Sequence, residues 1–211
     1  IIVTRNDMNH APEIYSYNLK KKTWLQITKT NDDAYAKLAL PKYERRYVTT
    51  TDGKKMLVWV ILPPNFDKNK KYPALLYCQG GPQSPLTQSY SFRWNFSLMA
   101  SQGYVVVAPN RRGMYGHGQE WNEKISKDWG GQVMDDYLSA IDDVAKESYV
   151  DKSRLGAVGA SYGGYSVYYL AGIHNNRFKT FISHCGVFNM ESMYGTTEEM
   201  FFTDWENGGA Y

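Results

Sequence analysis

A serine lies at the centre of the glycine-flanked pentapeptide Gly159-Ala160-Ser161-Tyr162-Gly163. The pattern Gly-x-Ser-x-Gly is typical of a nucleophile held at the tip of a sharp turn between a strand and a helix. The residues two positions before and after the serine must lack a Cβ so that the strand and the helix can approach each other. Such a turn places the serine at the positive end of the helix, which favours negative charge developing nearby. The expected chemistry is attack of the Ser161 hydroxyl on a carbonyl carbon.

The flanking sequence distinguishes this turn from a glycine-rich loop that holds a serine by chance. Residues 155–158 form a short apolar run that predicts a strand directly before Gly159, and residues 165–173 predict a helix after it. Gly164 adds a further small residue where that helix would pack on a sheet. Because both flanking elements are present, we interpret Ser161 as the nucleophile.

A second glycine-containing segment, Gln79-Gly80-Gly81-Pro82, directly follows an apolar run that ends at Cys78. The tetrahedral intermediate of acyl transfer needs two hydrogen-bond donors for its oxyanion. One is the backbone N–H after the nucleophile, here that of Tyr162, and the other comes from an early strand-to-helix loop. The two glycines allow the backbone to turn an N–H inward, although Gly-Gly-Pro on its own is only a turn. The place of this segment upstream of Ser161 favours an oxyanion-binding role.

Other polar and glycine-rich segments carry weaker signals. The run 113–118 lacks the Gly-x-Gly-x-x-Gly order of a dinucleotide-binding loop. Arg111 and Arg112 lie just past a predicted strand end, where ligand-binding loops gather, and we expect a structural ion pair for at least one of them. The pairs Asp135-Asp136 and Asp142-Asp143 fall on the polar side of a predicted helix and are expected to be solvated.

The apolar periodicity predicts an α/β protein. Two hairpins are expected near the N-terminus, one from strands 13–19 and 23–28 and one from strands 44–51 and 56–62. After residue 70, the expected strands are 74–78, 104–108, 154–158 and 180–185, and the expected helices are 92–102, 133–148 and 165–173. Short continuous apolar runs are typical of parallel strands buried on both faces. The pattern therefore predicts a mostly parallel sheet with helices on both faces, which begins with an antiparallel hairpin.

The composition argues against several function classes. The 211 residues carry a net charge of +3, and the one dense basic run, Lys20-Lys21-Lys22, fits a hairpin tip, so nucleic-acid binding is not expected. No apolar stretch approaches the roughly 20 residues that span a bilayer, so no membrane contact is expected either. Cys78 and Cys185 lie within apolar runs and are expected to be buried free thiols rather than a disulfide or zinc ligands. No metal site and no cofactor are expected.

Several segments together resemble the prolyl oligopeptidase family of serine peptidases. They are the Ser161 motif extended to Tyr165, the loop 79–82, Asn110-Arg111-Arg112-Gly113 and the run 149–155. The segment 195–199, Gly-Thr-Thr-Glu-Glu, is similar to the acylaminoacyl-peptidase and dipeptidyl-peptidase 5 branch. The resemblance covers nearly the whole chain. It implies an α/β-hydrolase peptidase domain over 41–211 whose C-terminal part is missing, preceded by the last blade of a β-propeller over 1–40.

The resemblance also implies roles for individual residues. Ser161 would be the nucleophile, and Tyr162 would donate its backbone N–H to the oxyanion. The pocket for the residue before the cleaved bond would be lined by Tyr162, Val187, Met190 and Met193. Two methionines would make that pocket adaptable to apolar side chains of middle size, but these residues could equally belong to the ordinary core.

Gln79 departs from the family pattern. Family members often carry a histidine or a tyrosine where this chain has Gln79, and the tyrosine hydroxyl can serve as an oxyanion donor. The sequence therefore leaves three groups open as the second donor: the N–H of Gly80, the N–H of Gly81 and the side-chain amide of Gln79.

A serine hydroxyl becomes a strong nucleophile only when a base takes its proton and a carboxylate orients that base. In α/β hydrolases the chain order is serine, acid, histidine. His174 and His184 follow Ser161, but His184 lies in a predicted strand with no aspartate between it and the serine, and His10 and His117 precede the serine. None of the four suits the base. The resemblance implies that the triad aspartate and histidine lie beyond the last residue of this chain.

The sequence thus predicts a serine exopeptidase that cleaves peptide bonds through an acyl-enzyme and releases dipeptides or (acyl)aminoacyl units from peptide N-termini. The 211-residue chain alone is expected to be inactive. Its partners would be peptide substrates, and a homodimer is compatible with the resemblance. The compartment would be the periplasm or the exterior if the dipeptidyl-peptidase 5 resemblance holds, and the cytoplasm otherwise. The alternatives are a carboxylesterase or lipase of the same fold, which the early hairpin disfavours, and a non-catalytic scaffold.

Overall fold

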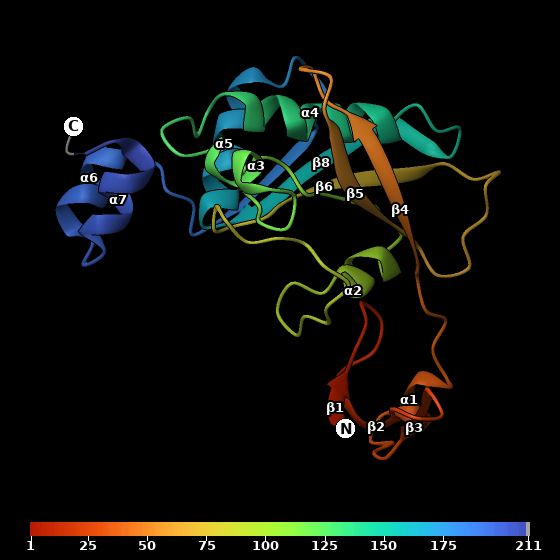
Figure 1. Cartoon of the computed structure of the whole chain (residues 1–211). Helices are drawn as coiled ribbons and strands as arrows, with labels where there is room; N and C mark the ends of the chain where they lie inside the picture. Colours follow the sequence, from red (N-terminus) through yellow and green to blue (C-terminus); the bar gives the residue numbers. More distant parts are fainter. Residues whose placement is uncertain (210–211) are drawn as a thin grey trace.

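The computed structural model describes residues 1–209, and the last two residues of the predicted peptidase domain, 210 and 211, lie outside that part (Figure 1). The described strands are β1 (Ile2–Arg5), β2 (Glu13–Asn18), β3 (Thr23–Gln26), β4 (Lys42–Thr49), β5 (Lys55–Leu62), β6 (Tyr72–Cys78), β7 (Val105–Pro109), β8 (Val150–Ala160) and β9 (Thr180–His184). The described helices are α1 (Asp32–Tyr35), α2 (Phe96–Ser101), α3 (Gln119–Glu123), α4 (Gln132–Val144), α5 (Tyr162–Ile173), α6 (Met190–Thr196) and α7 (Met200–Asn207).

Six of these strands form one sheet in the order β4-β5-β7-β6-β8-β9. The four strands β7, β6, β8 and β9 are parallel, whereas β5 pairs antiparallel with both β4 and β7. The predicted mostly parallel sheet that begins with an antiparallel hairpin is therefore confirmed. Because parallel strands end at one edge of a sheet, the segments that follow Cys78, Pro109, Ala160 and His184 gather at the same edge.

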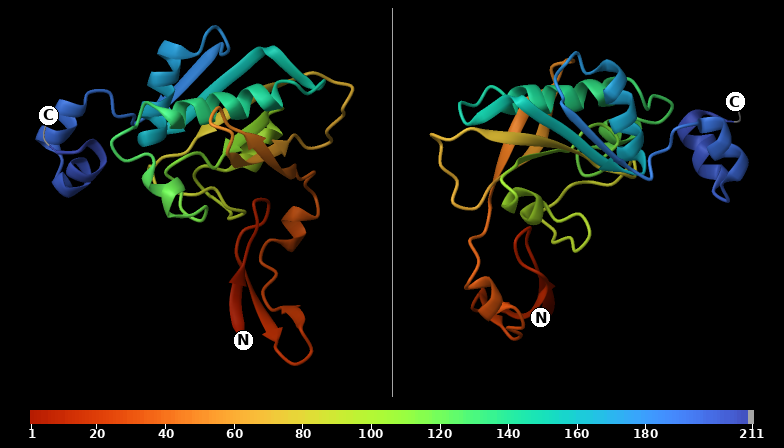
Figure 2. Two further views of the ribbon diagram at one scale, coloured as in Figure 1. Left: turned by 45° about the horizontal axis from the view of Figure 1, so that its top comes forward. Right: turned by 180° about the vertical axis from the view of Figure 1, so that it is seen from behind.

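Helices cover both faces of this sheet (Figures 1 and 2). Successive side chains of β5 point alternately to the two faces of the sheet. Val58 and Val60 belong to the core cluster that includes α4 and α5, whereas Trp59 and Ile61 belong to the cluster that includes α2. A strand that packs on both sides must be apolar at nearly every position. The continuous apolar runs in the sequence therefore reflect a sheet that lies between two helical layers.

The long predicted helix is α4, and its apolar stripe faces the sheet. At most 1% of the side chain is exposed in Met134, Tyr137, Ile141 and Val144. The helix ends at Val144 rather than at residue 148. The next turn is closed by hydrogen bonds to carbonyls three residues back, such as Lys146 N–H to Asp143 O at 3.2 Å. Bonds of this 3₁₀ type tighten the chain and end the α-helix.

Two other helices begin at residues that differ from the prediction. α2 begins at Phe96 instead of residue 92, because the Asn95 side chain accepts a hydrogen bond from Leu98 N–H at 2.9 Å and caps the helix. α5 begins at Tyr162 instead of residue 165. The first turn of α5 is therefore part of the predicted nucleophile motif.

The aspartates of α4 are not all solvated, and the prediction is wrong for Asp136. Asp135 is exposed, but Asp136 is fully buried and accepts hydrogen bonds from the backbone N–H (2.9 Å) and the guanidinium of Arg112. The same guanidinium donates to Asp52, in the turn between β4 and β5, and stacks 4.1 Å from the Trp121 ring centroid. The expected structural ion pair is confirmed for Arg112. The second aspartate pair forms partly exposed ion pairs, Asp142 with Arg177 and Asp143 with Arg46.

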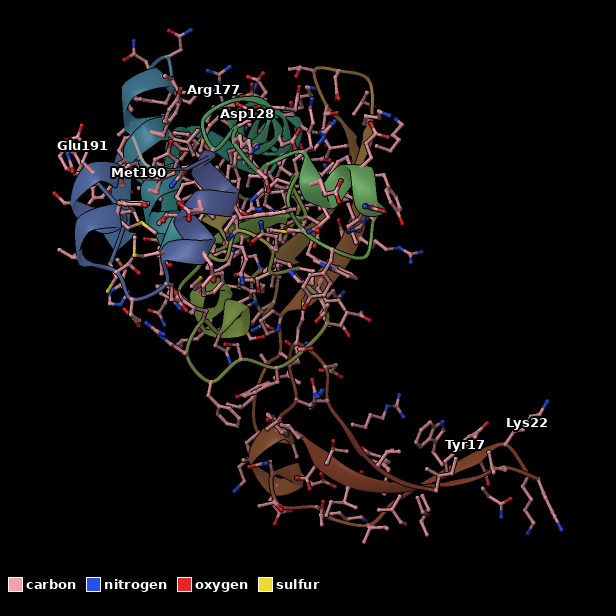
Figure 3. All side chains as sticks on the ribbon, turned by 60° about the vertical axis from the view of Figure 1, so that its left-hand side comes forward. Tyr17, Lys22, Asp128, Arg177, Met190 and Glu191 are labelled. Carbon is pink, nitrogen blue, oxygen red and sulfur yellow. The ribbon has the colours of Figure 1, made fainter. Side chains whose placement is uncertain are left out.

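The N-terminal sheet of β1, β2 and β3 lies apart from the main sheet (Figures 1 and 3). The predicted first hairpin is confirmed, because β2 pairs antiparallel with β3 and Lys22 lies at its tip. Tyr17 and Trp24 pack across this pair with ring centroids 4.5 Å apart. Part of the apolar surface is uncovered, as at Ile14 and Leu25. The assignment of this region to a propeller blade stays a prediction.

The two cysteines differ in exposure. Cys78 is buried as predicted, and burial raises the pKa of its thiol. Cys185 is exposed, so the expectation of two buried thiols is wrong. It directly follows β9 with a positive φ of 49°, and this turn takes the chain out of the sheet. No helix within residues 1–209 is long and apolar enough to cross a membrane, and no group of three His, Cys, Asp or Glu side chains there could hold a metal ion.

Replacing Asp136 by alanine tests the buried ion pair. We expect Asp136→Ala to lower the free energy of unfolding by about 3 kcal/mol or more, because the buried Arg112 guanidinium loses a partner. Asp135→Ala, one residue away on the exposed side of α4, should change it by less than about 0.5 kcal/mol. Urea unfolding followed by tryptophan fluorescence measures both variants. Equal losses in the two variants would contradict the assigned ion pair.

Candidate active site

Ser161 lies between the end of β8 and the start of α5, at the edge where the parallel strands end. Its backbone has φ 59° and ψ −124°, a conformation that residues with a side chain rarely adopt. Ser161 N–H donates to His184 O at 3.0 Å, and Tyr165 N–H donates to Ser161 O at 3.0 Å. A strained conformation persists only where its surroundings hold it, and such residues cluster at functional sites. The predicted strand–serine–helix context is therefore present.

The elbow glycines are required by the close approach of a neighbouring strand. A Cβ on Gly163 would overlap the carbonyl oxygen of Cys78, at the end of β6. A Cβ on Gly159 would lie 2.7 Å from the same oxygen, and one on Gly164 would lie 2.6 Å from the Cα of Gly186. These separations are shorter than van der Waals contact, so no other residue fits without a shift of the backbone.

The Gln79-Gly80-Gly81-Pro82 loop lies directly against the elbow. A Cβ on Gly80 would be 2.9 Å from Ala160 O and 3.5 Å from the Cβ of Ser161. Gly81 has a φ of 122°, which favours glycine. Within the described chain, the N–H groups of both glycines donate to no other residue. The Gln79 amide, in contrast, donates to Ser84 Oγ at 3.1 Å. These contacts favour a backbone N–H as the second oxyanion donor, which stays a prediction.

Tyr162 combines a backbone N–H that donates to no residue of the described chain with a side chain fixed in the core. The side chain is 1% exposed, and its hydroxyl donates to Trp129 O at 3.0 Å. The Trp129 ring meets the Tyr162 ring edge-on with centroids 4.8 Å apart. Burial raises the pKa of Tyr162 well above its ordinary value, so the phenol stays a neutral donor. The backbone N–H next to Ser161 is thereby held in one place.

A cavity of about 250 Å³ opens beside Ser161. It is lined by Tyr77, Gln79, Gly80, Gly81, Ser84, Arg93, Trp94, Ala160, Ser161, His184 and Cys185. Ser161, the predicted nucleophile, and the loop predicted to bind the oxyanion are thus brought together. The predicted pocket residues Tyr162, Val187, Met190 and Met193 are not among its lining. Met190 lies on α6 and packs against the core that includes α4 and α5 (Figure 3). The role of these four residues in binding substrate stays a prediction.

Arg93, Trp94, His184 and Cys185 are among the cavity residues that the sequence did not predict as site residues. Nη2 of Arg93 lies 3.3 Å from Nε2 of His184, and the Trp94 and His184 rings meet with centroids 5.9 Å apart. His184 and Cys185 could have been found, because they follow a predicted parallel strand and must reach the same edge as Ser161. Arg93 and Trp94 precede α2 and carried no comparable signal.

The histidines occupy four different surroundings, and none bonds to the serine hydroxyl within residues 1–209. His184 shares the Ser161 cavity, whereas the His174 ring accepts a hydrogen bond from Phe178 N–H at 3.1 Å. The His117 ring lies 5.9 Å from that of Trp121, and burial lowers the pKa of His117.

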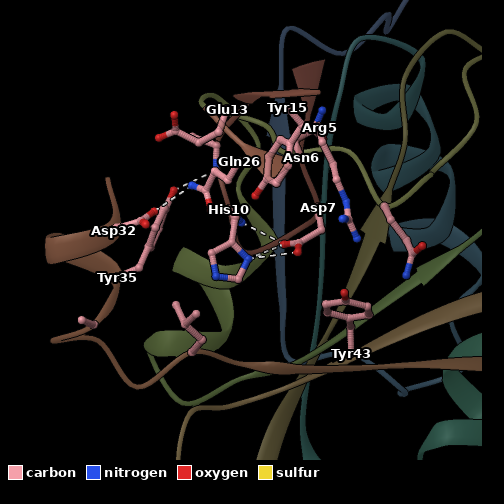
Figure 4. Close-up of a pocket in the computed structure, with 14 residues that line it drawn as sticks. Arg5, Asn6, Asp7, His10, Glu13, Tyr15, Gln26, Asp32, Tyr35 and Tyr43 are labelled. Atoms are coloured by element: carbon pink, nitrogen blue, oxygen red, sulfur yellow. Dashed lines mark hydrogen bonds and ion pairs between the residues drawn. The ribbon is translucent and has the colours of Figure 1, made fainter. Parts of the chain in front are cut away.

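His10 lies in the N-terminal part, where its Nδ1 is 2.9 Å from Asp7 Oδ1 (Figure 4). This pair borders a polar cavity of about 840 Å³ between the N-terminal sheet and α1. This cavity is larger than the one at Ser161 and shares no lining residue with it. A histidine–aspartate pair is therefore present, but it cannot act on Ser161 in this structure.

The sequence model of the prolyl oligopeptidase family matches residues 90–211. The match covers more than half of the chain, and the chain belongs to this family of serine peptidases. Two curated relatives are named Dipeptidyl-peptidase 5. That of Porphyromonas gingivalis is 54% identical over 211 residues, and that of Porphyromonas endodontalis is 52% identical over 210, in each case over 100% of this chain. The chain spans about a third of these relatives, 31% and 30% of their lengths.

Solved structures confirm the fold. An acylaminoacyl peptidase from Pyrococcus horikoshii superimposes with a TM-score of 0.89 at 23% identity, covering 98% of this chain and 33% of that one. The dipeptidyl peptidase 4 of Porphyromonas gingivalis superimposes with a TM-score of 0.69 at 26% identity, covering 84% of this chain and 26% of its own. The mixed, mostly parallel six-stranded sheet is thus shared with known peptidases.

A methyl group placed on an elbow glycine tests the close approach to Cys78. Gly163→Ala should lower the free energy of unfolding by about 1–3 kcal/mol, because its Cβ overlaps a backbone carbonyl that has no room to move. Gly172→Ala lies in the same helix, but a Cβ there meets nothing within 4 Å. That control should be neutral or stabilising by up to about 1 kcal/mol, since alanine favours helix over glycine. Urea unfolding measures both, and equal effects would contradict the close contact.

Proposed function

We propose that the protein containing this chain is a serine exopeptidase of the α/β-hydrolase fold that cleaves peptide bonds through an acyl-enzyme on Ser161. The observation that carries the proposal is the strained Ser161 backbone between β8 and α5, with the free N–H groups of Tyr162, Gly80 and Gly81 near it. Strain of this kind clusters at active sites, and free N–H groups beside a nucleophile suit an oxyanion. Membership of a peptidase family agrees with this role.

The reaction would begin with attack of Ser161 Oγ on the carbonyl carbon of the scissile bond, while a base takes the hydroxyl proton. The carbonyl oxygen becomes negative and accepts hydrogen bonds from the oxyanion donors. The C–N bond then breaks, the amine leaves with the proton from the base, and an ester remains on Ser161. Water, deprotonated by the same base, attacks that ester and frees the acid product and the hydroxyl. We assign the base and its carboxylate to parts of the protein outside residues 1–211, in keeping with the order serine, acid, histidine.

The finer proposal concerns the product. Relatives named Dipeptidyl-peptidase 5 support release of dipeptides, and a structural neighbour that is an acylaminoacyl peptidase supports release of single (acyl)aminoacyl units. Residues 1–40 would be the last blade of a β-propeller, and 41–211 would belong to the peptidase domain. Val187, Met190 and Met193 would line the pocket for the side chain before the cleaved bond, where methionines adapt to apolar groups of middle size.

Removal of the nucleophile tests the proposal in the whole protein. Ser161→Ala should lower kcat/KM for a dipeptidyl amide by a factor on the order of 10⁴ or more, and should abolish labelling by a fluorophosphonate. Ser101→Ala, at an exposed hydroxyl of α2, should leave both within about twofold of wild type. Unchanged peptide cleavage in Ser161→Ala would falsify the assignment. Cleavage of simple esters with every peptide left intact would indicate an esterase instead.

The assignment of the base to another part of the protein has its own test. Residues 1–211 produced alone should fold, as judged by circular dichroism, yet hydrolyse the dipeptidyl amide slower than the whole protein by a factor on the order of 10⁴ or more. The physical reason is that Ser161 would lack a group to take its proton. His184→Ala in the isolated chain should leave that residual rate unchanged. Turnover by the isolated chain at the rate of the whole protein would contradict the assignment.

A further inference from the structure

Arg111 is a fully buried cation that has no carboxylate partner within residues 1–209. Its guanidinium is satisfied by neutral oxygens instead. Nε donates to Tyr137 Oη at 2.9 Å, Nη1 donates to Pro82 O at 2.7 Å and to Arg112 O at 2.8 Å, and Nη2 donates to Gln79 O at 2.9 Å. Burying a charge is costly unless its surroundings compensate it, so these acceptors are arranged around a guanidinium.

Two of the four acceptors are the ends of the loop beside Ser161. Gln79 O comes before the two glycines, and Pro82 O belongs to the residue after them. Two successive glycines have wide conformational freedom, so their own backbone preferences cannot fix the direction of their N–H groups. A planar guanidinium that donates to both ends of the turn in a fixed fork geometry can fix it. Among residues 1–209, the N–H groups of Gly80 and Gly81 have no hydrogen-bond acceptor, so a ligand can use them.

The same guanidinium also contacts the residue that follows the nucleophile. The Arg111 Cζ lies 4.8 Å from the centroid of the Tyr162 ring, within the range of a cation–π interaction. A further contact, from Arg111 Nε to the Tyr137 hydroxyl, links the guanidinium to α4. Burial raises the pKa of Tyr137 to about 12, so its phenol is neutral. Arg111 thus joins both segments that carry free N–H groups beside Ser161.

We propose that Arg111 is a positioning residue that sets the separation of the two oxyanion donors, an inference that rests on the proposed peptidase function. Donors of this kind act mainly on the transition state, so their displacement lowers kcat and leaves KM nearly unchanged. Arg112 provides the comparison. It is also buried, but its guanidinium pairs with Asp136 and Asp52 and holds α4 to the β4–β5 turn.

The test uses the full-length protein with Arg111→Lys and, as matched control, Arg112→Lys. Lysine keeps the charge but has a single ammonium, which cannot reach both ends of the loop in the geometry of the fork. Arg111→Lys should lower kcat for a dipeptidyl amide on the order of 10²-fold, with KM within about threefold. Its affinity for a peptide aldehyde, which forms a tetrahedral adduct with Ser161 Oγ, should fall by a similar factor. Arg112→Lys should lower the thermal midpoint but keep kcat and aldehyde affinity within about threefold.

Several results would overturn the positioning role. They are wild-type kcat and aldehyde affinity in Arg111→Lys, an equal loss of kcat in Arg112→Lys, or a rise in KM with kcat unchanged. Arg111→Met, of similar volume and without charge, is measured in parallel. If neither Arg111 variant folds at low temperature by circular dichroism, Arg111 is a folding residue and the proposal fails. Ser161→Ala distinguishes failure of the peptidase proposal from failure of the Arg111 proposal. If the wild type cleaves no peptide, or if Ser161→Ala cleaves as fast as the wild type, both proposals are refuted. If cleavage depends on Ser161 but the Arg111 variants are unaffected, only the positioning role is refuted.

Discussion

The carbonyl oxygen of Cys78 occupies the space in which Gly163 would carry its Cβ atom, and a Cβ on Gly159 would lie 2.7 Å from the same oxygen. This contact brings three chain segments to one point: the end of β6, the end of β8 and the first turn of α5. β6 and β8 are neighbours in the sheet, with Cys78 opposite Gly159. Because packing of this density leaves little room for movement, the loop after Cys78 cannot lie elsewhere than beside Ser161. The strained serine backbone is therefore maintained by the packing of the sheet as well as by local hydrogen bonds.

Residues 110–112, which follow β7, hold together the segments around this contact. β7 lies between β5 and β6 near the middle of the sheet, so the residues that follow it can reach segments on either side. Asn110 accepts a hydrogen bond from Leu86 N–H at 2.9 Å and donates to Leu86 O at 3.1 Å. Arg111 holds the loop beside Ser161, and Arg112 holds α4 and the β4–β5 turn. The three consecutive side chains of Asn110, Arg111 and Arg112 thereby fix four different segments.

The features that could be predicted from the sequence are those encoded by residues close to one another along the chain. The motif around Ser161, the apolar stripe of α4 and the continuous apolar strands follow from local spacing, and each is confirmed in position to within a few residues. The burial of Asp136 was missed because its partner comes from a loop 24 residues away. The exposure of Cys185 was missed because the apolar run around it continues past the end of β9. Periodicity describes which face a residue takes, and it holds no information about a partner on another element.

Glu206 of α7 is a second buried ionisable residue that contacts the segment after the loop beside Ser161. It is 1% exposed, and its carboxylate accepts hydrogen bonds from Trp129 Nε1 at 2.9 Å and from Gln83 Nε2 at 2.5 Å. Gln83 directly follows the loop beside Ser161, and Trp129 packs on Tyr162. Neither Glu206 nor Arg111 pairs with an opposite charge in the described chain; each is solvated by neutral groups from several loops.

Because each buried charge is hydrogen-bonded by groups from several loops, a shift of any one of these loops destabilises the position of the others. Two buried opposite charges that faced each other could stay paired while the surrounding loops moved. A charge solvated by separate backbone and side-chain dipoles loses part of its solvation whenever one of them leaves, and an unsatisfied buried charge is costly. The N–H groups of Gly80 and Gly81 near Ser161 therefore belong to a loop that contacts both buried groups, directly for Arg111 and through the next residue, Gln83, for Glu206. The proposed binding of a developing negative charge would need donors that do not reorganise, and this form of solvation would supply that rigidity.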